Sequence, residues 1–212
     1  RNRAATVAAA LAREDPERAT DLVPELLSAV ESDHQVVVFQ SLVALSNVAG
    51  EAPGRLEPAV GRCVVLLGHD LPEVRNLAAE LLGAVAADRP ETLRGHADAL
   101  VAAAADEPED VVPAEGFEGV SDHTAKGLHE VNAEGRQQQM VARESAAVLL
   151  AELADHDPAA VEPRLDGVVD LLSDPNAGVV TGAADALASV AGEDPVAVAE
   201  AGALDPLVAL VD

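Results

Sequence analysis

The sequence has almost no aromatic residues: among its 212 residues there is no Trp, no Tyr and only two Phe, Phe39 and Phe117. Its apolar fraction is nevertheless 49%, so a core has to be built from Ala, Val and Leu. Ala and Leu are strong helix formers, and frequent Ala lets neighbouring helices approach closely. The scarcity of aromatic residues therefore favours an all-α protein.

The features of membrane-spanning and secreted proteins are also missing. No run approaches the roughly 20 apolar residues of a membrane-spanning helix, and no basic segment followed by a short apolar segment opens the chain as a signal peptide would. Cys63 is the single cysteine, which excludes an internal disulfide and a cysteine-based zinc cluster. We expect a cytoplasmic protein that does not contact membranes.

Positive charge is scarce as well. Thirteen Lys and Arg stand against 38 Asp and Glu, which gives a net charge of −25, and Lys126 is the single lysine. Such a negative field repels phosphate backbones, so we expect no binding of nucleic acid. The acidity has two interpretations: a surface for basic partners, or a composition resembling that of salt-accumulating halophilic archaea. We favour the second, because the acidity is spread along the whole chain.

Five prolines recur at a regular interval, each near the start of an apolar helical pattern. They are Pro16, Pro53, Pro90, Pro158 and Pro195. The gaps are 37, 37, 68 and 37 residues, and the long gap equals one 37-residue period plus 31 inserted residues. Ala stands four residues before every one of these prolines, and positions five, eight and twelve before them are apolar or small, which marks one face of a helix. A period of this size is typical of a solenoid.

Each unit is predicted to contain a helix A after the proline, a turn, and a helix B that ends before the next proline. The predicted units are residues 1–15 (partial, helix B), 16–52, 53–89, 90–157 with an insertion at 107–136, 158–194 and 195–212 (partial, helix A). Asp15, Asp157 and Asp194 precede three of the prolines and are predicted N-caps. Because both end units are partial, we expect the 212 residues to belong to a longer array.

The repeat resembles the HEAT repeat, a helical hairpin of similar length. Asp70 in a turn, followed by Val74 and Arg75, matches a pattern frequent in that family, and Arg143 falls on the same register as Arg75. Residues 44–50 (ALSNVAG) and 200–210 (EAGALDPLVAL) resemble the sister armadillo family. The resemblance implies a right-handed α-solenoid of HEAT/armadillo type whose function is protein binding, without enzyme activity.

In such solenoids the B helices line the concave face, and partners lie along it. The positions expected on that face are Gln40, Asn47, Glu80, Ser145 and Glu152. Asn47 matches the residue that holds extended peptides in importin-alpha-like armadillo arrays, but the equivalent positions of the other repeats hold no Asn, so a solvated helix residue is the alternative. Phe39 is a candidate interface anchor, with packing between repeats as its alternative.

The insertion, residues 107–136, has the sequence EPEDVVPAEGFEGVSDHTAKGLHEVNAEGR and no sustained apolar period. We expect a long loop without regular structure, of the kind that is usually functional or disordered. Phe117 and Lys126 are its candidate partner contacts. His123, His129 and Glu130 are weak candidates for metal ligands, and neither a cofactor nor a catalytic residue is predicted.

The sequence thus predicts a protein–protein interaction module that binds another protein or a peptide along the B-helix face and the insertion. Two alternatives remain open. One is a HEAT-type enzyme that holds a metal or cofactor near the insertion, and the other is a structural spacer.

Overall fold

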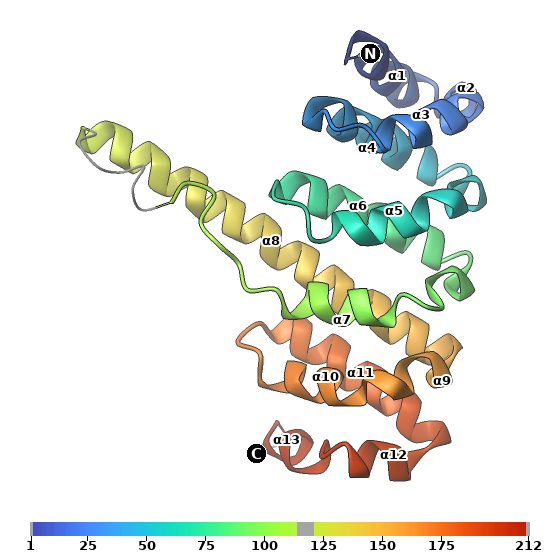
Figure 1. The fold of residues 1–212 in the computed structure, drawn as a ribbon, viewed down its shortest axis with the longest axis vertical. Helices are drawn as coiled ribbons and strands as arrows, with labels where there is room; N and C mark the ends of the chain where they lie inside the picture. The colour runs from blue at the N-terminus through green and yellow to red at the C-terminus, as the bar shows by residue number, and fades with distance from the viewer. Residues whose placement is uncertain (1, 114–120, 211–212) are drawn as a thin grey trace.

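A computed structural model describes residues 2–113 and 121–210 of the chain. The regular structure in these two ranges is entirely helical, without a strand, so the all-α prediction is confirmed. The helices form a stack of two layers, with the N-terminus at one end and the C-terminus at the other (Figure 1). No helix of the described ranges combines the length and the apolar character that crossing a membrane requires.

One layer, called here the long-helix layer, is built from the helices that the sequence predicted as helix B. They are α1 (Asn2–Glu14), α4 (Gln35–Ala49), α6 (Pro72–Ala86), α8 (Asp122–His156) and α11 (Ala177–Glu193). Each of them packs against the next along the stack. Helices α8 and α11 approach so closely at Gly182 that a Cβ there would lie 2.7 Å from the backbone carbon of Ala147.

The other layer consists of shorter pieces, where a single helix A was expected in each unit. Its elements are α2 (Pro16–Ala19), η1 (Thr20–Leu22), α3 (Val23–Val30), η2 (Pro53–Ala59), α5 (Val60–Leu66), η3 (Pro90–Leu93), α7 (Ala97–Ala105), α9 (Pro158–Val161), η5 (Glu162–Arg164), α10 (Leu165–Asp170), η6 (Leu171–Ser173), α12 (Pro195–Glu200) and α13 (Leu204–Ala209). Pro24, Pro58 and Pro163 lie inside or at the start of these pieces. A proline has no N–H to donate and clashes with the preceding turn, so it interrupts an α-helix.

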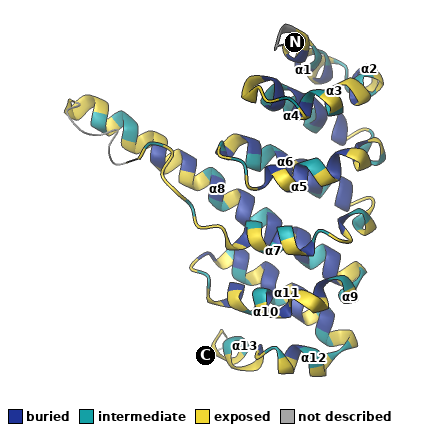
Figure 2. Ribbon diagram, in the orientation of Figure 1, coloured by how far each residue is buried: buried dark blue, intermediate teal, exposed yellow. Residues whose placement is uncertain are grey.

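The core lies between the two layers and consists of Ala, Val and Leu (Figure 2). The leucines eight residues before four of the recurrent prolines are at most 1% exposed: Leu45, Leu82, Leu150 and Leu187. The equivalent Ala8 on α1 is only half-buried. It lines an apolar groove of about 930 Å³ between α1 and α3, because no described element packs on that side of α1.

Two of the three predicted proline-preceding caps are present. Asp15 accepts a hydrogen bond from the main-chain N–H of Arg18, and Asp194 accepts from Val196 and Ala197. Asp157 occupies the predicted N-cap position of α9, but its side chain makes no capping hydrogen bond. Its carboxylate instead pairs with the guanidinium of Arg94, at 2.5 Å between Oδ2 and Nε.

The prediction of an irregular loop over residues 107–136 is wrong for its second half. Helix α8 begins at Asp122 and runs for 35 residues. Its N-cap is Ser121, whose Oγ accepts a hydrogen bond from the main-chain N–H of Thr124 at 3.3 Å. Phe117, a predicted partner contact, lies outside the described residues.

Candidate partner-binding site

The first part of α8 extends beyond the stack, as a helix that projects from one edge of the molecule (Figure 1). We call residues 122–141 the arm. Twenty residues of α-helix are about 30 Å long. Between Asp122 and Val131 no residue of the arm is buried, and Ala125, Gly127 and Leu128 are half-buried. The arm is therefore the largest departure from the regular stack.

An extended segment, residues 106–113, leads from the end of α7 outward along the arm, and we call it the strap. Two amide side chains of the arm hold it by its main chain. Asn132 Nδ2 donates to the carbonyl of Val112 at 2.9 Å, and the N–H of Val112 donates to Asn132 Oδ1 at 2.7 Å. Gln139 pairs with Glu109 in the same way. Its Nε2 donates to the carbonyl of Glu109 at 2.8 Å, and its Oε1 accepts from the N–H of Glu109 at 2.9 Å. Both amides are buried, at 2% and 5% exposure.

Two further arm residues contact the strap between these amides. Gly135 lies beneath Val111, and a Cβ at this glycine would collide with Cγ2 of that valine. Arg136 forms an ion pair with Asp110. Both partners of this ion pair are about half exposed, so it contributes little to stability.

The four arm positions have a regular order. Asn132, Gly135, Arg136 and Gln139 follow the i, i+3, i+4, i+7 spacing of one helix face, and we call them the clamp face. They contact strap residues 112, 111, 110 and 109 in turn, so the strap runs antiparallel to the arm. The arrangement holds an extended main chain through hydrogen bonds. It also contacts two side chains, Val111 in the notch at Gly135 and Asp110 at the positive charge of Arg136.

Two arginines fix the base of this arrangement to the stack. Arg75 of α6 forms an ion pair with Asp106, where the strap begins. Arg143 of α8 donates from Nε to the carbonyl of Ala104 at 2.9 Å and forms an ion pair with Asp174. In both ion pairs the Asp lies 31 residues after the Arg, so Arg75 and Arg143 make equivalent contacts.

Three of the candidate partner-binding residues, Phe39, Gln40 and Asn47, lie on α4. Phe39 is half-buried and packs against the core, and Gln40 is half-buried. Asn47 Nδ2 donates to the carbonyl of Val43 in its own helix at 2.6 Å. One of the two N–H groups of this amide is therefore used within α4.

The remaining candidates of the long-helix layer lie on α6 and α8. Glu80 is exposed, and Ser145 Oγ donates to the carbonyl of Val141 at 2.9 Å. Glu152 is half-buried, and its Oε2 atom is buried without a hydrogen-bond partner in the structure. Burial raises the pKa of its carboxyl above the ordinary value. Because α6 packs between α4 and α8, the structure does not bring Glu152 together with Asn47.

The candidate metal ligands lie on the exposed outer part of the arm. His123 and His129 are exposed, and Glu130 lies 3.9 Å from Lys126, one helical turn earlier. Within the described ranges no group of three or more His, Cys, Asp and Glu side chains is arranged to hold a metal ion. Cys63 is buried, and burial raises the pKa of its thiol to about 12, so it is not a reactive nucleophile.

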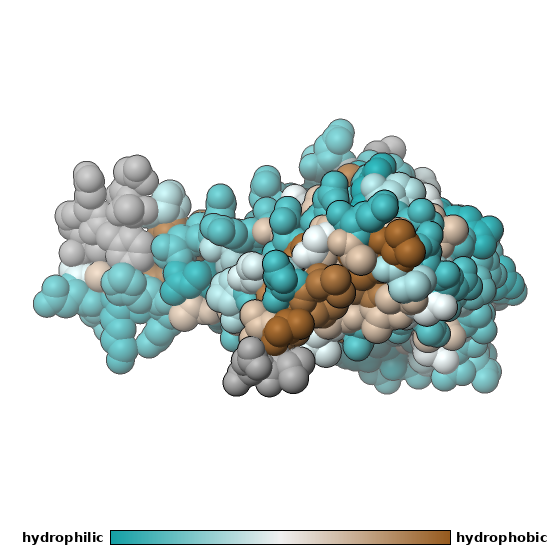
Figure 3. Space-filling view, turned by 90° about the horizontal axis from the view of Figure 1, so that it is seen from below, coloured by the Kyte–Doolittle hydropathy of each residue, from teal (hydrophilic) through white to brown (hydrophobic). Residues whose placement is uncertain are grey.

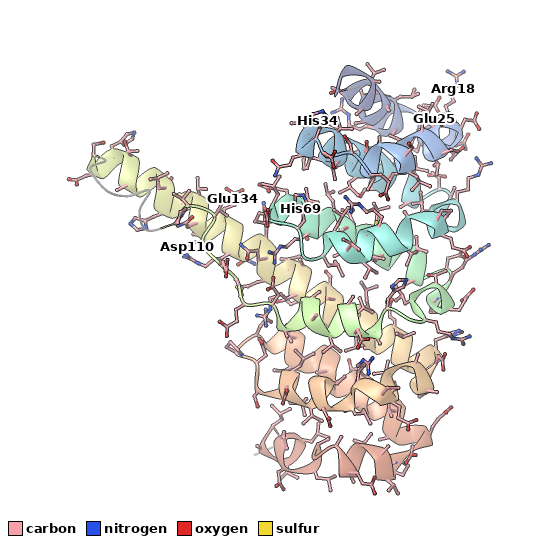
Figure 4. All side chains as sticks on the ribbon, in the orientation of Figure 1. Arg18, Glu25, His34, His69, Asp110 and Glu134 are labelled. Atoms are coloured by element: carbon pink, nitrogen blue, oxygen red, sulfur yellow. The ribbon has the colours of Figure 1, made fainter. Side chains whose placement is uncertain are left out.

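The edge of the stack from which the arm projects also carries His34 and His69, whereas Arg18 and Glu25 lie away from it (Figure 4). At the C-terminal end of the stack, hydrophobic residues gather over α12 and α13 (Figure 3). The exposed large residues of these last elements are Val196, Leu204 and Val208. This apolar end and the groove beside α1 are separate from the clamp face.

Sequence analysis missed the clamp face, although its pattern is visible in the sequence. Hydrophobic periodicity identifies a helix by its apolar stripe, but the stripe that the strap covers consists of Asn132, Gly135 and Gln139. Pro113 is a further signal, because the residue before a proline is restricted to extended conformations, and that residue is the clamped Val112.

No family model matches the sequence, and no curated protein does. The solved structures that match include the crystal structure of an engineered protein from a structural genomics programme. It is 21% identical to this chain with a TM-score of 0.64, and the match covers 99% of this chain and 82% of the engineered one. At this identity the match shows the fold alone.

Proposed function

We propose that this chain is a HEAT-type α-solenoid that binds another protein, with the arm and its strap as the main contact element. The observation that carries the proposal is the arm itself. The first part of α8 extends beyond the stack, no residue from Asp122 to Val131 is buried, and a dedicated strap is hydrogen-bonded to the turns that follow. A spacer that only separates its two ends gains nothing from such an element.

The HEAT-type architecture is supported by the contacts of the two arginines. Arg75 and Arg143 occupy equivalent positions on α6 and α8, and each binds an Asp 31 residues later. The stacked pairs of helices in Figure 1 agree with this interpretation. Repeats of this kind contact only their neighbours and present extended surfaces to partners.

The arm offers a surface away from the strap for such a partner. Val131, one turn before Gly135, is 46% exposed at the edge of the clamp face, and Val141 lies on the side away from the strap and is 37% exposed. The helical spacing places Glu134 on the same side, and it too is exposed. Partially exposed apolar residues with a polar neighbour are typical of the surface of a binding site.

The test is affinity capture of the tagged chain from its native cell, with quantification of the bound proteins. The variant Val131→Asp/Val141→Asp is compared with wild type and with Val65→Asp/Val196→Asp, whose valines are 64% and 62% exposed in the shorter-piece layer. We expect the arm variant to lose a specific partner at least tenfold while the control variant retains it. Equal recovery of the same proteins by all three chains would contradict the proposal.

A further inference from the structure

The clamp face is built to hold four consecutive residues of an extended chain, whichever chain supplies them. Asn132 and Gln139 each pair with both the N–H and the carbonyl of one residue. These contacts are to main-chain groups, so they require only an extended conformation and a residue other than proline. Neither amide has any contact that depends on the identity of the side chain it clamps.

Selectivity comes from the two positions in between. Gly135 leaves a notch that Val111 fills, and a Cβ at this glycine would close it. Arg136 presents a positive charge to Asp110. A chain that fits the clamp face therefore carries a carboxylate followed by a β-branched apolar residue, between two residues that are held by the main chain alone.

The resident occupant is held at the surface. Val111 is 43% exposed, and Glu109 and Asp110 are exposed, whereas the amides beneath are almost completely buried. Removal of the strap would expose the amides of Asn132 and Gln139 to water, which can satisfy them. The strap therefore resembles a tethered ligand on a helix face rather than a part of the core.

We propose that the clamp face is a docking site for an extended peptide segment of a partner protein, and that residues 109–112 are its resident, displaceable occupant. The segment has the chemistry x–acidic–β-branched–x, where x is any residue except proline. This inference rests on the proposed function and deepens it, because it names the kind of segment that the partner presents.

Charge decides the conditions under which such binding is observed. The chain carries a net charge of −25, which repels an acidic peptide at low ionic strength. At about 1 M salt the screening length falls to about 3 Å, whereas hydrogen bonds between neutral amides and a main chain persist. Binding is therefore expected to strengthen as the salt concentration rises.

The test uses a fluorescent peptide with the sequence of residues 106–113, DEPEDVVP, titrated by polarisation in about 1 M salt. The tethered strap competes with the peptide at a high effective concentration. The full chain with Asp110→Lys/Val112→Pro, which weakens the strap, is expected to bind the peptide at least tenfold more tightly than wild type. Adding Asn132→Ala/Gln139→Ala is expected to reduce this binding at least tenfold, while adding the control Gln137→Ala leaves it unchanged.

Lack of binding to the strap-weakened chain, or equal binding after the two amides are removed, would overturn the inference. If the arm frays without its strap, hydrogen exchange of residues 122–140 reports binding instead. The peptide should restore their protection, and a saturating concentration of peptide that does not restore it would also overturn the inference. A peptide with the changes Asp110→Lys and Val112→Pro is the matched control, and it should not bind. These measurements involve no cellular partner, so their failure is distinguishable from a failure of the capture experiment.

Discussion

Asn132 lies opposite Val112 and forms hydrogen bonds with both of its main-chain groups, at 2.9 Å from Nδ2 to the carbonyl and 2.7 Å from the N–H to Oδ1. This relationship connects the part of α8 that extends beyond the stack with the strap, which Gln139 also holds at Glu109. No residue from Asp122 to Val131 is buried, so we expect contacts such as this one to stabilise the arm.

The substitution Asn132→Ala is expected to destabilise the arm locally. Each lost hydrogen bond contributes about 0.5–1.5 kcal/mol, so the opening free energy of residues 122–136 should fall by about 1–3 kcal/mol. Hydrogen exchange measures this directly. Gln137→Ala, an exposed amide on the same helix, is the control, and equal protection in the two variants would contradict the role assigned to the clamp.

Two glycines of α8 give a matched pair of substitutions. Ala in place of Gly stabilises a helix interior by about 1 kcal/mol, and at Gly127 no atom of the described residues lies within 4 Å of the added Cβ. At Gly135 the same Cβ would collide with Val111. Gly127→Ala should therefore slow exchange throughout the arm, whereas Gly135→Ala should release the strap and speed exchange at Glu109 and Val112. If Gly135→Ala slows exchange of the arm as Gly127→Ala does and leaves the exchange of Glu109 and Val112 unchanged, the notch has no role.

The all-α class was predictable because it depends on the composition and the apolar pattern of the sequence. The scarcity of aromatic residues, the frequent Ala and Leu, and the recurrence of buried leucines such as Leu45 and Leu150 all indicate packed helices. The broken helices of the shorter-piece layer were less visible, because Pro58 and Pro163 lie within an otherwise apolar pattern. The arm was missed because its covered stripe is polar or small, and the strap that covers it is distant in sequence.

The two equivalent arginines differ in burial, and the cost of removing them should differ accordingly. The side chains of Arg143 and Asp174 are 5% and 12% exposed, whereas those of Arg75 and Asp106 are 15% and 47% exposed. Arg143→Met leaves an almost buried carboxylate unpaired, which typically costs about 3–5 kcal/mol. Arg75→Met should cost no more than about 1–2 kcal/mol, because water solvates Asp106. Urea unfolding of both variants tests this order, and the reverse order would contradict it.

Glu152 gives a pH-dependent prediction. Burial raises the pKa of its carboxyl in the folded chain, so its stabilising contribution is complete below the unfolded-state pKa of about 4.3 and is lost as the pH rises through the folded-state pKa. Glu152→Gln cannot ionise and should therefore have a higher Tm than wild type at about pH 7 but not at about pH 3. Glu80→Gln, at an exposed position of α6, is the control. An advantage of Glu152→Gln that is the same at both pH values would contradict this explanation.

Site-specific crosslinking in the native cell tests whether the arm contacts a partner protein. A photoreactive residue is placed at Val131 of the arm and, in a separate chain, at Val65 of α5, two exposed positions of the same residue type. We expect a discrete crosslinked product of higher mass from position 131 and none from position 65. No product from position 131, or the same product from both positions, would contradict it.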